Sequence, residues 1–391
     1  MENHFSDTEL AFKHLSDGRL RKSILLYRLF QRSWVTKLGS FLLLRFLYFR
    51  FPIENLIKKT VFSQFCAGET LEESHKTALL LAQSRVGSIL DYSAEGEQHE
   101  KGFESNALQL QNAIRKAAQH PNVYPFAVFK STAVGSTAIL TKVTLGLSLE
   151  KEEKNQFQNW KNRMKKICAL SASLDLPIFI DAEESYIQGA IDDLVLGLMK
   201  TFNKEKPMIY NTVQLYRKEG LDIVKKFLEQ AKQDGFFLGF KLVRGAYLEK
   251  EQKWASENQR VNPINENKKM TDDMFDDAVI LCMNNLDIVS FCAGTHNEKS
   301  TLKIMDMMKK MNLNNEDKRI WFAQLLGMSD NLSFVLASNK YNCAKYLPFG
   351  PIREVMPYLI RRAEENSAVS GQMGRELTLL LQEKKRRKLW F

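Results

Sequence analysis

The sequence predicts an α/β fold, a distorted (β/α)8 barrel of the TIM type that follows an α-helical N-terminal arm. From about residue 85, short apolar strands alternate with amphipathic helices, which implies parallel strands joined by right-handed crossovers. Eight such strand and helix units can be distinguished. The length of 391 residues and the hydrophobic content of 44% suit a barrel with a large core and an added arm.

Residues 1–84 are predicted to form the helical arm. The segments LLYRLFQ, FLLLRFLYFR and ESHKTALLLAQ place apolar residues three or four positions apart, which is the spacing of one helix face. Pro52 interrupts this pattern and suits the first turn of the helix that follows. We therefore expect an arm of several helices that packs on the barrel.

Eight short apolar segments are the candidate strands of the barrel, which is predicted to occupy residues 85–370. They are SILDYSA from Ser88, PFAVFK from Pro125, PIFIDA from Pro177, PMIYNTVQ from Pro207, GFKLVR from Gly239, DIVSFCAG from Asp287, RIWFAQLL from Arg319 and NCAKYLPF from Asn342. An open doubly wound sheet is the alternative, but no Gly-x-Gly-x-x-Gly fingerprint opens any helix. Residues 371–391 are predicted to form a basic tail.

Polar side chains recur within or just past the carboxyl ends of these strands, and they are Asp91, Lys130, Asp181, Gln214, Lys241, His296 and Tyr346. In a barrel these ends meet at one mouth, where the chemistry of such folds is found. Ordinary capping and turn chemistry explains the aspartates well, but it explains the two lysines poorly. The sequence therefore predicts a functional site at the barrel mouth.

The net charge of +10 is concentrated at two places. Residues 18–53 hold eight Lys or Arg and no Asp or Glu, and the C-terminal KKRRKLWF holds five more bases. Basic amphipathic helices are typical of membrane-surface contacts, and the alternative is that their apolar sides pack on the barrel while the bases face water. No nucleic-acid-binding motif accompanies the charge, so we expect no nucleic-acid partner.

The composition also argues against several classes of protein. No run of about 18 uncharged apolar residues is present, so we expect no transmembrane helix. The start, MENHFSDTEL, lacks the apolar region of a secretory signal. Five scattered cysteines without a Cys-x-x-Cys pair predict reduced core residues and a cytoplasmic protein, with any membrane contact peripheral and on the inner face. Six histidines, none paired with a cysteine at ligand spacing, predict no metal site.

Residues 346–366, YLPFGPIREVMPYLIRRAEEN, read as a strand, a turn and a helix. The turn contains two prolines and Gly350, and the helix places Tyr358 on one face with Arg361 or Arg362. Guanidinium groups bind carboxylates in two-point fashion, so these residues with Glu365 form a candidate carboxylate site. The alternative is a solvated helix end with an Arg–Glu pair.

This segment resembles the C-terminal signature of the proline dehydrogenase family, flavin enzymes that oxidise L-proline. Five further stretches match the same family in the same order, and they are FKSTAVGS from Phe129, FIDAEESY from Phe179, MIYNTVQLY from Met208, FKLVRGAYLEKE from Phe240, and GTHN with FAQLLGMSDN within residues 294–331. The resemblance covers roughly residues 85–370. It implies a monofunctional member, since the chain is too short for the aldehyde dehydrogenase that bifunctional members also carry.

The resemblance implies a non-covalently bound FAD inside the barrel mouth. Lys241 would lie near the reactive N5 of the flavin, and Gln214 would hydrogen-bond the flavin ring. The family also has the opposite order of bases in this motif, so Arg244 stays open as the N5 contact. The further implied cofactor contacts are Val243, Gly245, Ala246, Tyr247, Thr295, His296 and Asn297.

For the substrate, the resemblance implies that the carboxylate of L-proline is bound by Arg361, Arg362 and Lys130, and that Glu365 holds these cations in place. The ring would be enclosed by Leu325, Tyr346 and Tyr358. Asp181 is implied as a site carboxylate that orients a lysine or the flavin, so Asp181 and Lys241 are the candidate catalytic residues. Hydride would pass from C5 to flavin N5 and give Δ1-pyrroline-5-carboxylate, and a quinone would accept the electrons.

Three other functions stay open at this point. A hydroxyproline dehydrogenase is the nearest alternative, although Tyr346 leaves little room for a 4-hydroxyl group. A catalytically silent flavin-binding or membrane-adaptor protein is the second, although it would not need the whole substrate set. A nucleic-acid-binding regulator that uses the basic arm is the third, and a flat, salt-insensitive DNA titration would exclude it.

Overall fold

The computed structural model describes residues 5–30, 54–93, 99–356, 358–360 and 370–389. Its strands form one eight-stranded sheet in the order β1-β8-β7-β6-β5-β4-β3-β2, a nearly closed (β/α)8 barrel. The strands are β1 (Gly87–Tyr92), β2 (Ala127–Lys130), β3 (Ile178–Asp181), β4 (Ile209–Gln214), β5 (Leu238–Val243), β6 (Val289–Gly294), β7 (Ile320–Leu325) and β8 (Cys343–Phe349). All eight predicted strands are thereby confirmed, as is the fold class.

The chain divides into two compact units, which are described separately here. One unit is Gly96–Ala323, and the other is Met1–Glu95 together with Gln324–Phe391. The predicted domains 1–84, 85–370 and 371–391 divide the chain differently from these two units, and they stay a prediction.

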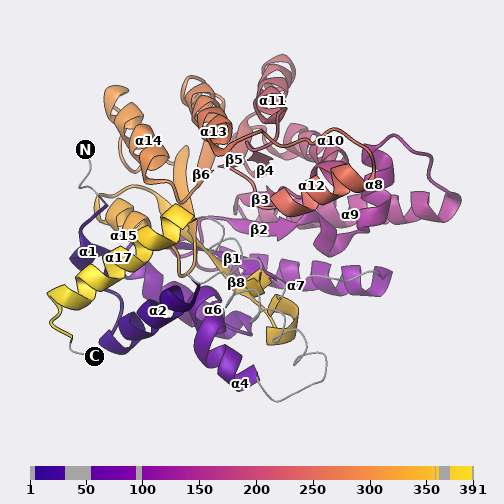
Figure 1. The fold of residues 1–391 in the computed structure, drawn as a ribbon. Coiled ribbons are helices and arrows are strands. Elements are labelled where there is room, and N and C mark those ends of the chain that lie inside the picture. The colour runs from indigo at the N-terminus through magenta and orange to yellow at the C-terminus, as the bar shows by residue number, and fades with distance from the viewer. Residues whose placement is uncertain (1–4, 31–53, 94–98, 357, 361–369, 390–391) are drawn as a thin grey trace. The chain divides into compact units, whose positions relative to one another are not determined.

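In the unit Gly96–Ala323, helices and strands alternate along the chain (Figure 1). Its paired strands run parallel, with Lys130 in register with Asp181 and Thr212 in register with Lys241. Its helical elements are α7 (Glu100–Ala118), η2 (Ser131–Val134), α8 (Thr137–Thr144), α9 (Lys151–Ser173), α10 (Ser185–Phe202), α11 (Gly220–Asp234), α12 (Leu248–Glu257), α13 (Lys268–Met283) and α14 (Glu298–Lys310).

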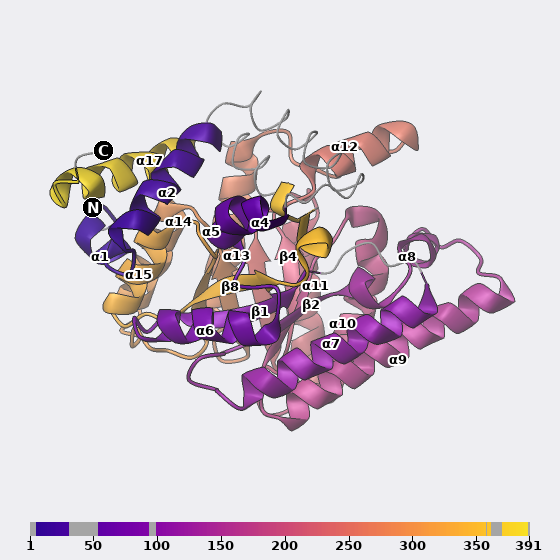
Figure 2. The same cartoon turned by 90° about the horizontal axis from the view of Figure 1, so that it is seen from below.

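Helix α9 illustrates how the sequence specifies these helices. A capping box between Glu150 and Glu153 satisfies backbone N–H groups at its start. Its buried face carries Trp160, Met164 and Ile167 at three- to four-residue spacing. Figure 2 shows α9 running beside α7, against which it packs. The apolar stripe itself meets the connection after β2, since Trp160 donates to the Ser131 hydroxyl at 3.1 Å.

The other unit contains the helices of both termini. They are α1 (Thr8–Phe12), α2 (Asp17–Phe30), α4 (Glu54–Ile57), the π-helical turn η1 (Lys58–Phe62), α5 (Ser63–Phe65), α6 (Leu71–Ala82), α15 (Asp330–Ser338) and α17 (Ser370–Arg386), with further helical residues at 352–356 and 358–360. Helix α17 packs against α1 and α2, as both Figure 1 and Figure 2 show. The described part of the predicted arm is therefore helical.

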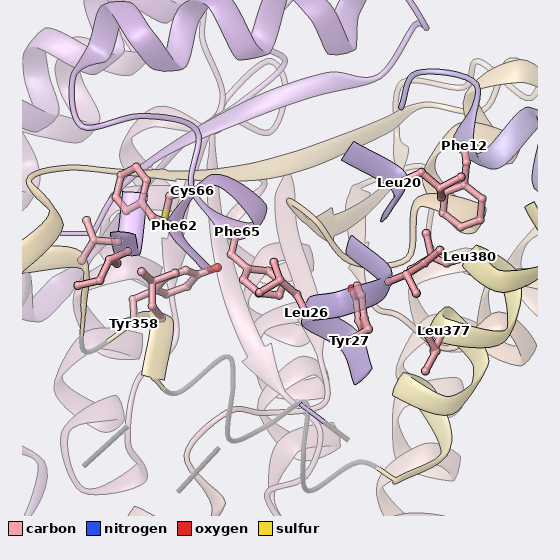
Figure 3. Close-up of a cluster of buried hydrophobic side chains, with 14 of the residues drawn as sticks. Phe12, Leu20, Leu26, Tyr27, Phe62, Phe65, Cys66, Tyr358, Leu377 and Leu380 are labelled. Atoms are coloured by element: carbon pink, nitrogen blue, oxygen red, sulfur yellow. The ribbon is translucent and has the colours of Figure 1, made fainter. Parts of the chain in front are cut away.

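An apolar cluster holds this unit together (Figure 3). Phe12 and Leu20 of the first two helices lie near Leu377 and Leu380 of α17, and all four are buried. Full burial of a large apolar side chain contributes about 1.5–3 kcal/mol. The C-terminal helix is thus part of the core that the N-terminal helices form.

The basic tail is partly engaged inside the same unit. The Arg387 guanidinium donates to the carbonyl oxygens of Phe12 and Leu15, each at 2.7 Å, and so satisfies the end of α1. Buried Glu383 accepts hydrogen bonds from both Arg386 and Arg387. These two arginines therefore serve the packing of the terminal helices.

Two further sequence-based expectations concern the whole chain. All five cysteines are buried, which confirms their prediction as core residues. Within the described ranges, no helix combines the length and the apolarity that crossing a bilayer requires.

Candidate active site

A buried ion pair joins two strands of the unit Gly96–Ala323. The Lys241 ammonium donates to the Asp181 carboxylate, and their side chains are only 7% and 15% exposed. Asp181 ends β3, whereas Lys241 lies two residues before the end of β5. The ammonium also lies 5.8 Å from the centre of the Phe179 ring. The pair fixes a lysine at a place where an isolated buried charge would be costly.

Lys130 lies beside this pair. It is the last residue of β2 and stands in register with Asp181 of β3, so both side chains leave the same face of the sheet. Lys130 is partly exposed. The structure therefore brings together the predicted residues Lys130, Asp181 and Lys241.

Glu183, two residues past β3, is a buried acid that the sequence reasoning did not select. Its carboxylate accepts from the Thr132 N–H at 2.8 Å and from the Thr132 hydroxyl. Burial raises the pKa of Glu183 to about 7, although the Thr132 hydrogen bonds and the charge of Lys130 act in the opposite direction. The paired acids in FIDAEESY, just past a predicted strand, are the signal that could have found it.

Gln214 ends β4 and is buried. Its amide donates to the Glu183 carbonyl oxygen at 2.7 Å and accepts from the Ala246 N–H at 3.3 Å. A side-chain amide has two N–H groups and two lone pairs, so each end can take one more partner. The position is compatible with the predicted flavin contact.

Arg244 lies one residue past β5 and belongs to a second polar group of the same unit. Its guanidinium donates to Asp272 at 2.6 Å, to the Thr295 hydroxyl at 2.8 Å and to the Ser300 hydroxyl at 3.0 Å. It also stacks at 4.5 Å over the Phe275 ring. Lys241 and Arg244 therefore have different partners, although only three positions separate them in the sequence.

Asn297 and Gly245 have local structural roles that the resemblance did not include. Asn297 caps α14, since its side chain accepts from the N–H groups of Lys299 and Ser300. Gly245 has φ of 144°, and a Cβ there would lie 2.4 Å from the Tyr216 ring. The other predicted cofactor contacts nearby are Val243, Ala246, Tyr247 and His296, all of them partly or fully exposed.

The remaining predicted substrate residues belong to the other unit. Leu325 ends β7 and is partly buried, and Tyr346 is a buried residue inside β8. Tyr358 is buried in the apolar cluster together with Phe62 (Figure 3). The predictions for Arg361, Arg362 and Glu365 lie outside the described residues.

This second unit also contains a buried charge network that sequence reasoning missed. Lys345 of β8 donates to Asp330 at 2.7 Å, and His14 lies 3.2 Å from the same carboxylate. The lysine also donates to the carbonyl oxygens of Leu325 and Met328. The partners are far apart in the sequence, so no local pattern points to the network. Among the residues with described positions, no group of three His, Cys, Asp or Glu could hold a metal ion.

Comparisons with known proteins agree with the resemblance. The sequence matches the proline dehydrogenase family over residues 74–375. It is 34% identical over 330 residues to the carbapenem antibiotics biosynthesis protein CarD of Pectobacterium carotovorum subsp. carotovorum, covering 83% of this chain and 84% of that protein. It is 33% identical over 380 residues to the mitochondrial proline dehydrogenase 1 of Dictyostelium discoideum. This match covers 86% of this chain and 66% of that protein.

The human mitochondrial proline dehydrogenase 1 is 38% identical over 239 residues, which cover 60% of this chain and 40% of the human protein. Among solved structures, proline utilization A from Bdellovibrio bacteriovorus, inactivated by N-propargylglycine, superposes with a TM-score of 0.73. That match has 19% identity and covers 82% of this chain and 34% of the other, so it supports the fold alone. With the family match over most of its length, this chain belongs to the proline dehydrogenase family, oxidoreductases that act on proline.

Proposed function

We propose that this protein oxidises L-proline to Δ1-pyrroline-5-carboxylate with FAD as its cofactor. Family membership supports the substrate and the reaction class. The single structural observation that carries the proposal is the buried Lys241–Asp181 pair, with Lys130 in register beside it. A structural core gains little from a buried lysine–carboxylate pair with a second lysine at the neighbouring strand end, whereas a site for an anionic substrate and a redox cofactor uses both lysines.

The residues of the unit Gly96–Ala323 fit a flavin chemically. Lys241 offers a fixed cation, and Gln214 offers an amide that can both donate and accept. The first turn of α14, next to Arg244, offers the positive end of a helix, which suits a diphosphate. FAD, when bound, supplies the acceptor atom for a hydride from the proline ring.

The protein groups then have separate tasks. Asp181 holds the Lys241 ammonium, so that a positive charge stays fixed where negative charge develops. Lys130 binds the substrate carboxylate, and Arg361 and Arg362 are predicted to do the same. Cations around the substrate disfavour a protonated amine. The neutral nitrogen keeps its lone pair, which is what hydride departure from the adjacent carbon requires.

We further propose that a quinone takes up the electrons and that exposed bases of the protein touch a membrane surface. Arg386 and Arg387 are engaged by Glu383, so this contact would use other bases of α17 such as exposed Lys385. Binding to anionic liposomes at low salt, but not to neutral ones, is the expected result. No binding to either kind would argue against the membrane contact.

The test of the main proposal is a visible spectrum of the purified protein, recorded without oxygen before and after L-proline is added. Flavin absorption that bleaches with L-proline, and much less with 4-hydroxyproline, is expected. The variant Lys130→Met should keep the flavin and need a higher proline concentration for the same bleaching. Bound flavin that no imino acid bleaches would refute the substrate, and no flavin after FAD is added would refute the cofactor.

A further inference from the structure

A chain of hydrogen bonds links four successive strand-to-helix connections of the unit Gly96–Ala323. Thr132 follows β2, Glu183 follows β3, Gln214 ends β4 and Ala246 follows β5. Both the N–H and the hydroxyl of Thr132 donate to the Glu183 carboxylate. The Glu183 carbonyl accepts from Gln214, and Gln214 accepts from the Ala246 N–H. Each connection is therefore held by its neighbour.

In this series of hydrogen bonds, Glu183 takes part through both its side chain and its backbone. Its side chain holds the connection after β2, and its backbone carbonyl holds Gln214. Its own N–H donates to the Gln188 side chain at 2.8 Å, which fixes the backbone on the α10 side. Removing the carboxylate therefore releases Thr132 but leaves the Gln214 contact in place.

The burial of Glu183 makes a passive role a poor explanation. The residue is 3% exposed, and a buried carboxyl is costly even when it accepts hydrogen bonds. Strongly perturbed buried acids gather where a protein must hold functional groups in place.

We propose that Glu183 is a positioning residue that holds Lys130 in place for the substrate carboxylate through its two hydrogen bonds to Thr132. The proposal rests on the proposed function, since it assigns Lys130 to the proline carboxylate. Lys130 lies two residues before Thr132 and ends the strand that runs into this connection. A displacement of about 1 Å at such a group can cost a hundredfold in activity.

The first variant is Glu183→Ala. It should raise the proline KM about tenfold to a hundredfold, the range expected for lost hydrogen bonds to a charged group. The affinity for FAD, measured by titrating the apoprotein, should change by less than about threefold, because the backbone contact to Gln214 remains. A merely structural role would raise the proline KM, weaken FAD binding and lower the thermal stability together.

Three more variants isolate the side-chain contact. Glu183→Gln keeps an acceptor for the Thr132 N–H and should recover most of the proline KM. Thr132→Val removes the hydroxyl hydrogen bond and keeps the backbone one, so it should raise the KM less than Glu183→Ala does. It should add little in the Glu183→Ala background, because Glu183→Ala already removes the acceptor of that hydroxyl. Glu184→Gln is the matched control, since Glu184 is also buried in this connection but pairs with Lys250 at 2.8 Å, and its KM should stay unchanged.

The outcomes separate the two proposals. A wild-type protein whose flavin is not bleached by proline refutes the function. If the wild-type flavin is bleached while Thr132→Val keeps the wild-type KM, Glu183 does not position Lys130. Independent, multiplying effects of Thr132→Val and Glu183→Ala lead to the same conclusion. Thr132→Val and Glu183→Gln decide the matter should Glu183→Ala fail to fold.

Discussion

Replacing Lys345 by methionine should strongly destabilise the unit formed by Met1–Glu95 and Gln324–Phe391. Methionine has a similar length but no charge, so the change removes the ammonium and leaves the packing nearly intact. The Lys345 side chain is 1% exposed and donates to Asp330 at 2.7 Å and to the Met328 carbonyl oxygen at 2.6 Å. The variant therefore leaves the Asp330 carboxylate buried, with the His14 imidazole 3.2 Å away.

The size of the effect follows from the burial of the pair. Burial alone would raise the pKa of Asp330, but the charge of Lys345 and the His14 hydrogen bond outweigh it and hold that pKa well below its usual range. Asp330 is thus charged at neutral pH, and removing one partner of such a pair costs about 3–5 kcal/mol. With an unfolding entropy of about 2 cal/mol/K per residue and unfolding of all 391 residues together, this corresponds to a Tm lower by about 4–6 °C.

The assay is thermal unfolding followed by circular dichroism at pH 7, supported by denaturant unfolding. The double variant Lys345→Met with Asp330→Asn should recover most of the loss, because it removes the stranded charge as well. Lys385→Met is the control, since Lys385 is exposed and its change should stay within about 0.5 kcal/mol. A Lys345→Met protein as stable as the wild type, or a double variant no better than the single one, would refute the reasoning.

Gly327→Ala and Glu376→Gln test the same unit, and Gly235→Ala is a comparison in the unit Gly96–Ala323. Gly327→Ala should destabilise by about 2 kcal/mol or more, since Gly327 has φ of 75° and a Cβ would lie 2.0 Å from the Gln64 carbonyl oxygen. Gly235 has φ of 65°, but no atom lies within 4 Å of an added Cβ, so Gly235→Ala should lower the free energy of unfolding by only about 1 kcal/mol. Equal losses of unfolding free energy in the two glycine variants would contradict the steric explanation. Burial raises the pKa of Glu376 from 4.5 to about 7, so the folded state holds this proton more tightly than the unfolded state. Wild-type stability should therefore fall between about pH 4.5 and 7, by up to about 3 kcal/mol from this group, and Glu376→Gln should gain relative to the wild type over that window. Melting curves whose difference does not change with pH would exclude this titration.

Local patterns in the sequence were sufficient for the eight strands and for the charged residues that lie at their ends. Apolar periodicity identified the eight strands, because strand alternation and helix spacing are properties of neighbouring residues. Lys130 and Lys241 were identified because capping and turn chemistry explains a lysine at the end of an apolar strand poorly, and Asp181 because it lies at another of these strand ends. The family motifs then assigned chemistry to these positions.

Contacts between segments that are far apart in the sequence could not be predicted from local patterns. Lys345 sits next to Tyr346 in an apolar strand, yet only the tertiary structure shows that both are buried and that Asp330 and His14 meet the lysine. Glu183 gains its role from Thr132, which lies 51 positions earlier.

The sequence by itself determined the alternation of strands and helices, the basic ends and the residue types available for the site. Only the tertiary structure decided which charges meet, as when Arg387 of the basic tail binds the last carbonyl groups of α1. The physical reason is that propensity and periodicity act over a few residues, whereas the cost of a buried charge depends on partners that the fold brings from anywhere in the chain.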